Sequence, residues 1–172
     1  MFNYLFSTTK IKDFYNYVFG DDAFPQSYYY DFITQAFVKD GIHVGNKIFS
    51  DQSGQVSQHL QADITMSTAN WMATLLDAGH RVMFYVGNLD ICICYRNTDK
   101  FLRQLEWSGK VEFNAVRKQI WRLDGEVAGY ARVVEPLLHV AVHASGHTVP
   151  RDQPERSLDM INKFITKQSF GS

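Results

Sequence analysis

The stretch Gly146-His147-Thr148-Val149-Pro150, read together with Gly87-Asn88-Leu89-Asp90 upstream, decides how this chain is expected to fold. Each stretch follows a run that is apolar at nearly every position, residues 81–86 in one case and residues 137–143 in the other. Such runs are typical of strands that are covered on both faces of a parallel sheet. Because polar loops beyond the carboxyl ends of parallel strands share one edge of the sheet, we expect Asp90 and His147 at the same edge.

The rest of the chain alternates helical and strand-like patterns. Residues 119–123 and 127–134 indicate strands joined by a hairpin-type turn at Asp124-Gly125. Apolar residues at three- and four-residue steps predict a helix over 63–78, with short helices over 28–37 and 96–106. The stripe expected on the longest of these is Ile64, Thr68, Trp71, Leu75 and Ala78, widened by Met72 and Leu76. The order predicts an α/β protein.

The C-terminal end of the chain predicts one more helix. Asp152-Gln153-Pro154-Glu155 resembles a capping box with an early proline, so Asp152 is expected to cap the helix that follows. The apolar stripe of this helix is Leu158, Ile161, Phe164 and Ile165.

Composition excludes several classes of function. The chain has 172 residues, which fits one ordinary domain, and its 45% hydrophobic and 20% charged residues are normal for a globular protein. A net charge of −1 provides no electrostatic case for binding nucleic acid or an anionic membrane. No apolar run reaches 18 residues, so we expect no membrane span. The first six residues lack the basic and apolar regions of a signal peptide.

An aspartate and a histidine at one sheet edge have a specific chemical use. A carboxylate that holds one ring nitrogen fixes the tautomer of the imidazole and stabilises the imidazolium. The histidine can then take a proton from a serine hydroxyl and return it to a leaving group. In α/β-hydrolases these residues follow in the order Ser, Asp, His, which places a serine upstream of Asp90. Spacing alone leaves the pairing open, because Asp is a common turn residue and His a common surface residue.

The sequence resembles the C-terminal part of the serine carboxypeptidases. The upstream part of this sequence is most similar to the vitellogenic-like branch of that family. These enzymes are α/β-hydrolase peptidases that remove C-terminal amino acids. The resemblance rests on five ordered stretches, which are Ile42-His43-Val44-Gly45-Asn46, Val82 to Asp90, Leu105-Glu106-Trp107-Ser108-Gly109, Gly125 to Tyr130, and Gly146 to Arg156.

The resemblance implies a fold and a set of roles. Residues 41–172 would form the C-terminal half of an α/β-hydrolase core, with a mixed, mostly parallel sheet flanked by helices, and residues 1–40 a remnant of the cap insertion. Asp90 would be the acid of the triad and His147 its histidine, with Cys92 and Thr148 near the substrate side-chain pockets. The implied substrates are peptide C-termini, no cofactor is implied, and the implied location is the secretory pathway, either lysosomal, vacuolar or extracellular.

The sequence departs from the family in two places. The nucleophile motif Gly-Glu-Ser-Tyr-Ala-Gly has no counterpart in these residues, and neither does any G-x-S-x-G. Where the family often has a cysteine three residues after the acid, Ile93 stands here, with Cys92 one position earlier. Two functions follow as alternatives. The chain is a fragment or subunit that acts with an N-terminal chain carrying the serine, or it is an inactive truncated homologue that binds or assembles.

Two other patterns could hold a metal ion. His139, His143 and His147 recur every four residues, and Cys92 and Cys94 form a C-x-C. No glutamate or cysteine completes the histidine set, so we expect packed or edge histidines and no metal site. A disulfide between the two cysteines is geometrically unfavourable on an extended segment, and we expect buried free thiols.

Overall fold

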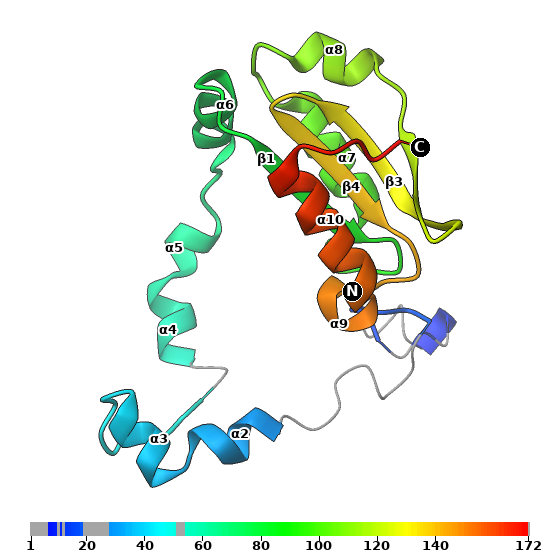
Figure 1. Ribbon diagram of the computed structural model, residues 1–172. Coiled ribbons are helices and arrows are strands. Elements are labelled where there is room, and N and C mark those ends of the chain that lie inside the picture. The colour runs from blue at the N-terminus through cyan, green and yellow to red at the C-terminus, as the bar shows by residue number, and fades with distance from the viewer. Residues whose placement is uncertain (1–6, 10, 12, 19–27, 51–53, 172) are drawn as a thin grey trace. The chain divides into compact units, whose positions relative to one another are not determined.

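The computed structural model describes residues 7–9, 11, 13–18, 28–50 and 54–171 (Figure 1). The chain divides into two compact units, one formed by Met1–Ala23 with Thr68–Ser172 and the other by Phe24–Ser67. The first unit contains the sheet and both stretches that decided the expected fold. The predicted division of the chain at residue 40 stays a prediction.

A mixed sheet of four strands forms the centre of the larger unit, in the order β1-β4-β3-β2. The strands are β1 (Val82–Gly87), β2 (Gln119–Leu123), β3 (Glu126–Val134) and β4 (Leu137–Val142), and each lies where the sequence predicted a strand. β1 pairs with β4 in parallel, while β4 with β3 and β3 with β2 are antiparallel. The predicted hairpin turn is confirmed, with both Asp124 and Gly125 at positive φ.

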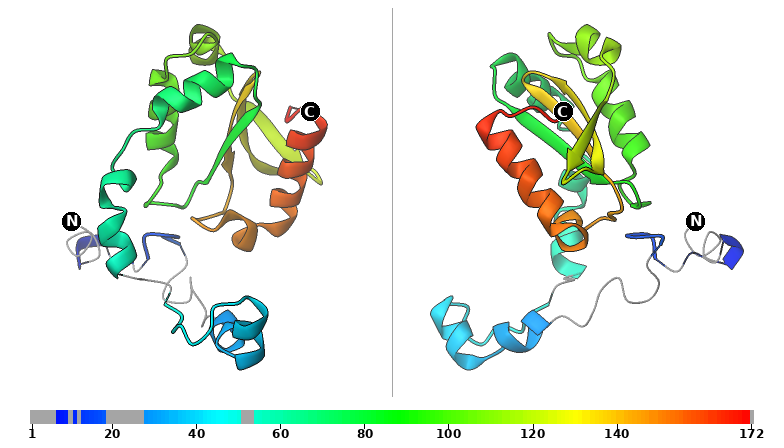
Figure 2. Two further views of the ribbon diagram at one scale, coloured as in Figure 1. Left: turned by 90° about the vertical axis from the view of Figure 1, so that its left-hand side faces the viewer. Right: turned by 45° about the vertical axis from the view of Figure 1, so that its right-hand side comes forward.

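Helices cover both faces of this sheet (Figures 1 and 2). On one face lies α10 (Pro154–Thr166), preceded by the short α9 (Val149–Asp152). Its Met160 packs with Trp121, Leu138 and Val140 in a buried apolar cluster. On the other face lie α6 (Ala69–Asp77), α7 (Tyr95–Gln104) and α8 (Lys110–Ala115), and the buried residues of that cluster include Leu76, Leu102, Phe113 and Leu137. The expected α/β class, with a mixed sheet flanked by helices, is therefore confirmed. The sheet was expected to be mostly parallel, but among the described strands β1 with β4 is the one parallel pairing, since β2, β3 and β4 follow one another through tight turns.

The helix predicted over 63–78 is wrong in its extent and in its buried face. The chain forms α5 (Gln61–Ile64) and α6, with Thr65 to Thr68 between them. Thr65 donates its hydroxyl hydrogen bonds back to the carbonyls of Gln61 and Ala62, which offers the backbone an alternative to a continued helix. The expected stripe is exposed at Ile64, Trp71 and Leu75. The residues that only widened it, Met72 and Leu76, pack on the core instead.

The smaller unit consists of short helices and aromatic contacts. The single helix predicted over 28–37 is two, α2 (Tyr28–Ile33) and α3 (Ala36–Gly41), and α4 (Gly54–His59) follows together with α5. Thr34 donates its hydroxyl hydrogen bond to the carbonyl of Tyr30, where the first of the two helices ends. The ring of Phe49 meets that of Tyr30 edge to face, at 5.5 Å between centroids.

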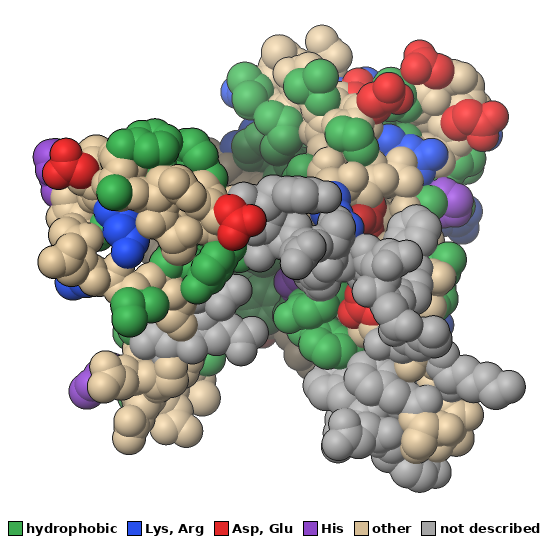
Figure 3. Space-filling model, turned by 90° about the horizontal axis from the view of Figure 1, so that it is seen from below, with side chains coloured by type: hydrophobic (Ala, Val, Ile, Leu, Met, Phe, Trp, Pro, Cys, Tyr) green, Lys and Arg blue, Asp and Glu red, His purple; other side chains and the backbone are tan. Residues whose placement is uncertain are grey.

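Two features of the larger unit are open to solvent. The predicted stripe of the terminal helix is only partly in the core: Phe164 packs there, whereas Leu158, Ile161 and Ile165 are exposed. Among the residues that the structure describes, β1 has a strand partner on one edge only. Figure 3 shows hydrophobic side chains at the surface in several places on the face that it views.

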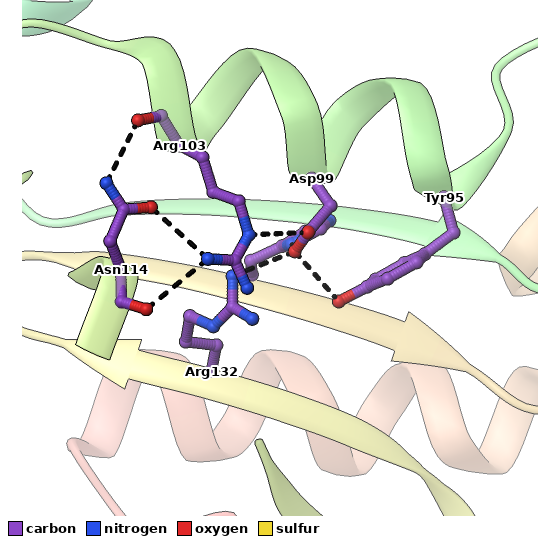
Figure 4. Close-up of polar contacts among 6 residues, drawn as sticks. Tyr95, Asp99, Arg103, Asn114 and Arg132 are labelled. Carbon is purple, nitrogen blue, oxygen red and sulfur yellow. Dashed lines mark hydrogen bonds and ion pairs between the residues drawn. The ribbon is translucent and has the colours of Figure 1, made fainter. Parts of the chain in front are cut away.

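A partly buried polar network lies between α7 and the sheet (Figure 4). Asp99 of α7 accepts hydrogen bonds from Arg103 and from Arg132 of β3, both at 2.8 Å. His139 of β4 is fully buried, stacks on the ring of Tyr95 at 4.5 Å between centroids, and lies 3.5 Å from Asp99 Oδ1. Burial alone would raise the pKa of Asp99, but the hydrogen bond from Arg103 and the charge of Arg132 outweigh it, so that pKa is lowered.

The network makes stability depend on pH. Burial lowers the pKa of His139 from 6.5 to about 4, and the positive charges of Arg132 and Lys118 act in the same direction against the opposing charge of Asp99. Because the unfolded chain binds this proton more readily, the free energy of unfolding should fall as the pH drops from 6.5 toward 4, by up to about 3 kcal/mol.

His139→Phe keeps the stacking partner of Tyr95 and cannot titrate. We expect thermal unfolding of this variant in the intact protein to show a shallower loss of stability between pH 6.5 and 4 than the native protein. His143→Phe, at an exposed histidine just after β4, is the control and should keep the native pH dependence. An unchanged pH dependence in the His139 variant would contradict the assignment.

Candidate functional site

The parallel pairing of β1 and β4 brings the two polar loops together. Gly87, the last residue of β1, is in register with Val142, the last residue of β4. Beyond the strands the loops stay joined, because the N–H of Asn88 donates to the carbonyl of Val142 at 3.0 Å and that of Leu89 to the carbonyl of Ser145 at 2.8 Å. The expectation that both loops lie at one edge of the sheet is therefore met in the structure.

Gly87 permits this close approach. A Cβ atom at this position would lie 2.2 Å from the carbonyl oxygens of both Ser145 and Gly146. This separation is too short for any side chain. Since both neighbours are backbone atoms, any side chain at residue 87 would have to separate the loops.

Asp90 is held firmly in the site. Its Oδ1 accepts hydrogen bonds from the N–H groups of Cys92 at 2.7 Å and of Ile93 at 3.1 Å. Its Oδ2 lies 2.8 Å from Nδ1 of His147, a residue 57 positions later in the chain. The Asp90 side chain is 3% exposed and that of His147 is 38% exposed. The carboxylate is thus removed from water, while the imidazole stays accessible.

This geometry supports one kind of proton chemistry. With Nδ1 engaged by the carboxylate, Nε2 is the ring nitrogen left to take up and release a proton. Ionised Asp90 also stabilises the imidazolium that forms when it does so. The pair can therefore act as a base toward a hydroxyl, but it supplies no nucleophile.

The structure corrects the expectation for the cysteines. Cys92 is exposed and Cys94 is half-buried, and both are free. The chain turns after Asp90 instead of continuing as a buried strand, so these residues lack the expected cover. A cavity of about 510 Å³ opens beside Asp90, with Cys94, Tyr17 and Tyr130 in its lining.

Cys92 and Thr148 are not among the described residues that line this cavity, and Thr148 is exposed at the start of α9. Their roles near a substrate pocket stay predictions.

The three histidines have three different environments. His139 is buried in the network under α7, His143 is exposed just after β4, and His147 contacts Asp90. In the described part of the chain no three histidine, cysteine, aspartate or glutamate side chains lie close enough to hold a metal ion.

The sequence did not indicate two further contacts of the loop that carries His147. The carbonyl of Tyr15 accepts a hydrogen bond from the N–H of His147 at 2.7 Å, and the two rings lie 4.9 Å apart between centroids. Asp152 does not cap α10 as predicted; its Oδ2 accepts from the N–H of Gly146 at 2.7 Å. No sequence signal near residue 15 indicates the contact with His147, because it joins segments far apart in the chain.

Comparison with known proteins identifies the family. The profile of the serine carboxypeptidases matches residues 4–167. This chain belongs to the serine carboxypeptidase family. The resemblance seen in the five sequence stretches is confirmed.

Relatives within the serine carboxypeptidases are longer than this chain. It is 36% identical over 162 residues to the probable serine carboxypeptidase CPVL of Mus musculus, covering 92% of this chain and 34% of the mouse protein. It is 37% identical over 168 residues to the vitellogenic carboxypeptidase of Aedes aegypti, covering 96% of this chain and 36% of that protein. The chain thus spans about a third of the length of these curated relatives.

A solved structure shows the same fold. The crystal structure of Kex1(delta)p, a prohormone-processing carboxypeptidase from Saccharomyces cerevisiae, matches with a TM-score of 0.79 at 21% identity. The match covers 96% of this chain and 40% of the yeast protein. Among the described residues, no helix combines the length and hydropathy that crossing a membrane requires.

The tight contact at Gly87 is open to test. We expect Gly87→Ala to lower the free energy of unfolding by about 2 kcal/mol or more, because its methyl group meets two backbone carbonyls. Chemical denaturation of the intact protein measures this. Gly41→Ala is the control, since a Cβ there meets nothing within 4 Å, and it should change stability by less than about 1 kcal/mol. Equal effects of the two substitutions would contradict the packing argument.

Proposed function

We propose that this protein is the part of a serine-type carboxypeptidase that supplies the triad acid, Asp90, and the triad base, His147. A serine from outside these 172 residues completes the triad. The observation that carries the proposal is the 2.8 Å contact between Asp90 Oδ2 and His147 Nδ1, with the aspartate buried and hydrogen-bonded at its other oxygen. Family membership supplies the reaction class, which is hydrolysis of the C-terminal peptide bond.

The mechanism follows from the positions of the two groups. Nε2 of His147 takes the proton of the serine hydroxyl as its oxygen attacks the carbonyl carbon of the terminal peptide bond. The imidazolium, stabilised by Asp90, then protonates the leaving amine, and the peptide remains as an ester on the serine. Water hydrolyses this ester with the same histidine as base. Apart from the peptide and water, every group in these steps is a side chain of the proposed enzyme, so the proposal includes no cofactor.

Two open surfaces support the presence of a further portion. The free edge of β1 leaves backbone donors and acceptors without a strand partner in the described structure, and β1 is the strand that leads to Asp90. The exposed stripe of Leu158, Ile161 and Ile165 on α10 is the kind of surface that a packed partner covers. The curated relatives are about three times as long as this chain.

The substrates and location proposed here follow from the family. We propose peptide and protein C-termini as substrates and the secretory pathway as the location, either lysosomal, vacuolar or extracellular. An N-terminal portion or chain carrying the serine is the proposed partner.

One observation favours a second function. The residues include no G-x-S-x-G, so a chain limited to them has no nucleophile of the kind the family uses. The alternative is therefore an inactive homologue that retains the fold for binding or assembly.

Labelling of the native protein with a fluorophosphonate, together with its intact mass, separates the two functions. The first function predicts that the protein is labelled on a serine outside residues 1–172. That serine lies either on the same polypeptide or on a chain that co-purifies with it. His147→Ala should abolish the labelling, because the serine loses its base. His143→Ala removes a nearby exposed histidine and should label normally. A native species of 19.8 kDa that takes no label would establish the alternative.

Asp90→Asn tests the role of the carboxylate. The amide keeps the size of the side chain but cannot stabilise an imidazolium, so we expect kcat for a peptide substrate to fall by about 10³–10⁴-fold. Circular dichroism should show an unchanged fold. Asp124→Asn, at the exposed hairpin turn, is the control and should keep full activity. A less than tenfold loss in the Asp90 variant would remove that residue from the triad.

A further inference from the structure

A short segment near the N-terminus, residues 13–18, bridges the two loops of the proposed site. The carbonyl of Phe14 accepts hydrogen bonds from the N–H groups of Ile91 at 3.0 Å and Cys92 at 3.2 Å, directly after Asp90. The next carbonyl, that of Tyr15, accepts from the N–H of His147 at 2.7 Å. Two consecutive peptide groups of this segment therefore bind the loop of the acid and the loop of the base.

The side chain of Asn16 helps to anchor the segment. Asn16 is 3% exposed, and its Nδ2 donates to Oδ2 of Asp152 at 2.9 Å. The same oxygen accepts from the N–H of Gly146 at 2.7 Å, the residue before His147. The Oδ1 of Asn16 accepts from the N–H of Val18 at 3.2 Å and so holds the segment in its turn. Asn16 thereby connects the segment to the histidine loop through a single carboxylate oxygen.

Gly146 fits tightly against this segment. A Cβ atom on it would lie 2.3 Å from the carbonyl oxygen of Tyr15 and 2.7 Å from the Cβ of Asn16. The histidine loop is thus in contact with segment 13–18 on one side and, through its carbonyl, with Gly87 on the other. Movement of the segment would shift His147 along with it.

We propose that residues 13–18 form a strap that sets the position of His147 relative to Asp90, with Asn16 and Asp152 as its positioning residues. The inference rests on the proposed function. Neither residue touches the reacting atoms; each acts through the peptide group of Gly146 or His147. Proton transfer in such a pair depends on sub-ångström placement, because a displacement of about 1 Å can cost about 100-fold in rate.

A charge exchange between the two residues tests the strap. Asn16→Asp places two carboxylates in contact, which repel when both are ionised and raise the pKa of the pair. At about pH 7 we expect kcat to fall by about 10–100-fold, with KM changed by less than about threefold. As the pH is lowered and the two carboxylates share one proton, kcat should recover. Asp152→Asn alone should also lower kcat, because it removes the charged acceptor.

The double variant Asn16→Asp/Asp152→Asn reverses the roles of the two side chains. The amide introduced at position 152 can donate to the carboxylate introduced at position 16, while its carbonyl oxygen accepts from the N–H of Gly146. We expect kcat within about fivefold of the native value and loss of the pH dependence introduced by the single variant. Asn162→Asp, at an exposed position on α10, adds the same charge elsewhere and should change neither kcat nor its pH profile.

A measurement that needs no activity separates this inference from the proposed function. Hydrogen exchange of the intact protein, followed by mass spectrometry, reports on peptides over 88–93 and 145–149. The strap predicts faster exchange in both peptides for Asn16→Asp and native exchange for the double variant. Where Asn16→Asp does not fold, Asn16→Ala removes the same donor without adding charge and should give the same faster exchange.

The outcomes are then distinct. If the native protein hydrolyses no peptide and takes no fluorophosphonate, the proposed function fails, while the exchange data still decide whether the strap exists. If the single variants exchange like the native protein, or the double variant recovers neither exchange nor kcat, the strap is overturned even where the enzyme is active.

Discussion

The parallel pairing of β1 with β4 is the constraint on which the site depends. Asp90 and His147, 57 residues apart, leave the sheet side by side only because their strands run in the same direction and in register. All six positions of β4 are buried, so a one-residue shift in its pairing would exchange its two buried faces and move His139 from Asp99 into the apolar cluster beside Leu138 and Val140. Burying a polar group without its partner is unfavourable, which makes this register strongly preferred. The packing of β4 thereby holds the carboxylate of Asp90 and the imidazole of His147 in contact.

The two faces of the sheet are covered in different ways. Against α10 the packing is apolar, around Trp121, Leu138 and Val140. Against α7 the packing is apolar around Leu102 and Leu137 but also includes polar groups, because Arg132 and His139 face Asp99. A buried ionic group of this kind is stable only when it is paired. Here the carboxylate of Asp99 accepts hydrogen bonds from both Arg103 and Arg132. The cost of protonating His139 makes the stability of this face depend on pH in the acid range.

The proposed site joins parts of the chain from three distant regions. Asp90 and His147 come from the loops after β1 and β4, and the strap comes from residues 13–18. Gly87 and Gly146 make this assembly possible, because each lies where a carbonyl oxygen occupies the space of a side chain. The open edge of β1 and the exposed stripe of α10 belong to the same unit, and both fit a family whose curated relatives are about three times as long. The part of the site that this chain contains is thus already built by contacts within it.

The sequence by itself determined the strands, the hairpin, the terminal helix and the two loops that carry Asp90 and His147. These follow from local patterns, since continuous apolar runs and turn residues act over a few positions. Only the tertiary structure decided which face of α6 is buried and that Cys92 is exposed and Cys94 half-buried. It also decided that Asp152 binds the N–H of Gly146 instead of capping a helix, and that residues 13–18 contact His147. The buried face of α6 and the contact with residues 13–18 depend on partners far away in the sequence, whereas Asp152 and Gly146 are only six residues apart and are brought together by the turn of their loop. Periodicity records which residues can be buried together, but it does not identify the segment that covers them.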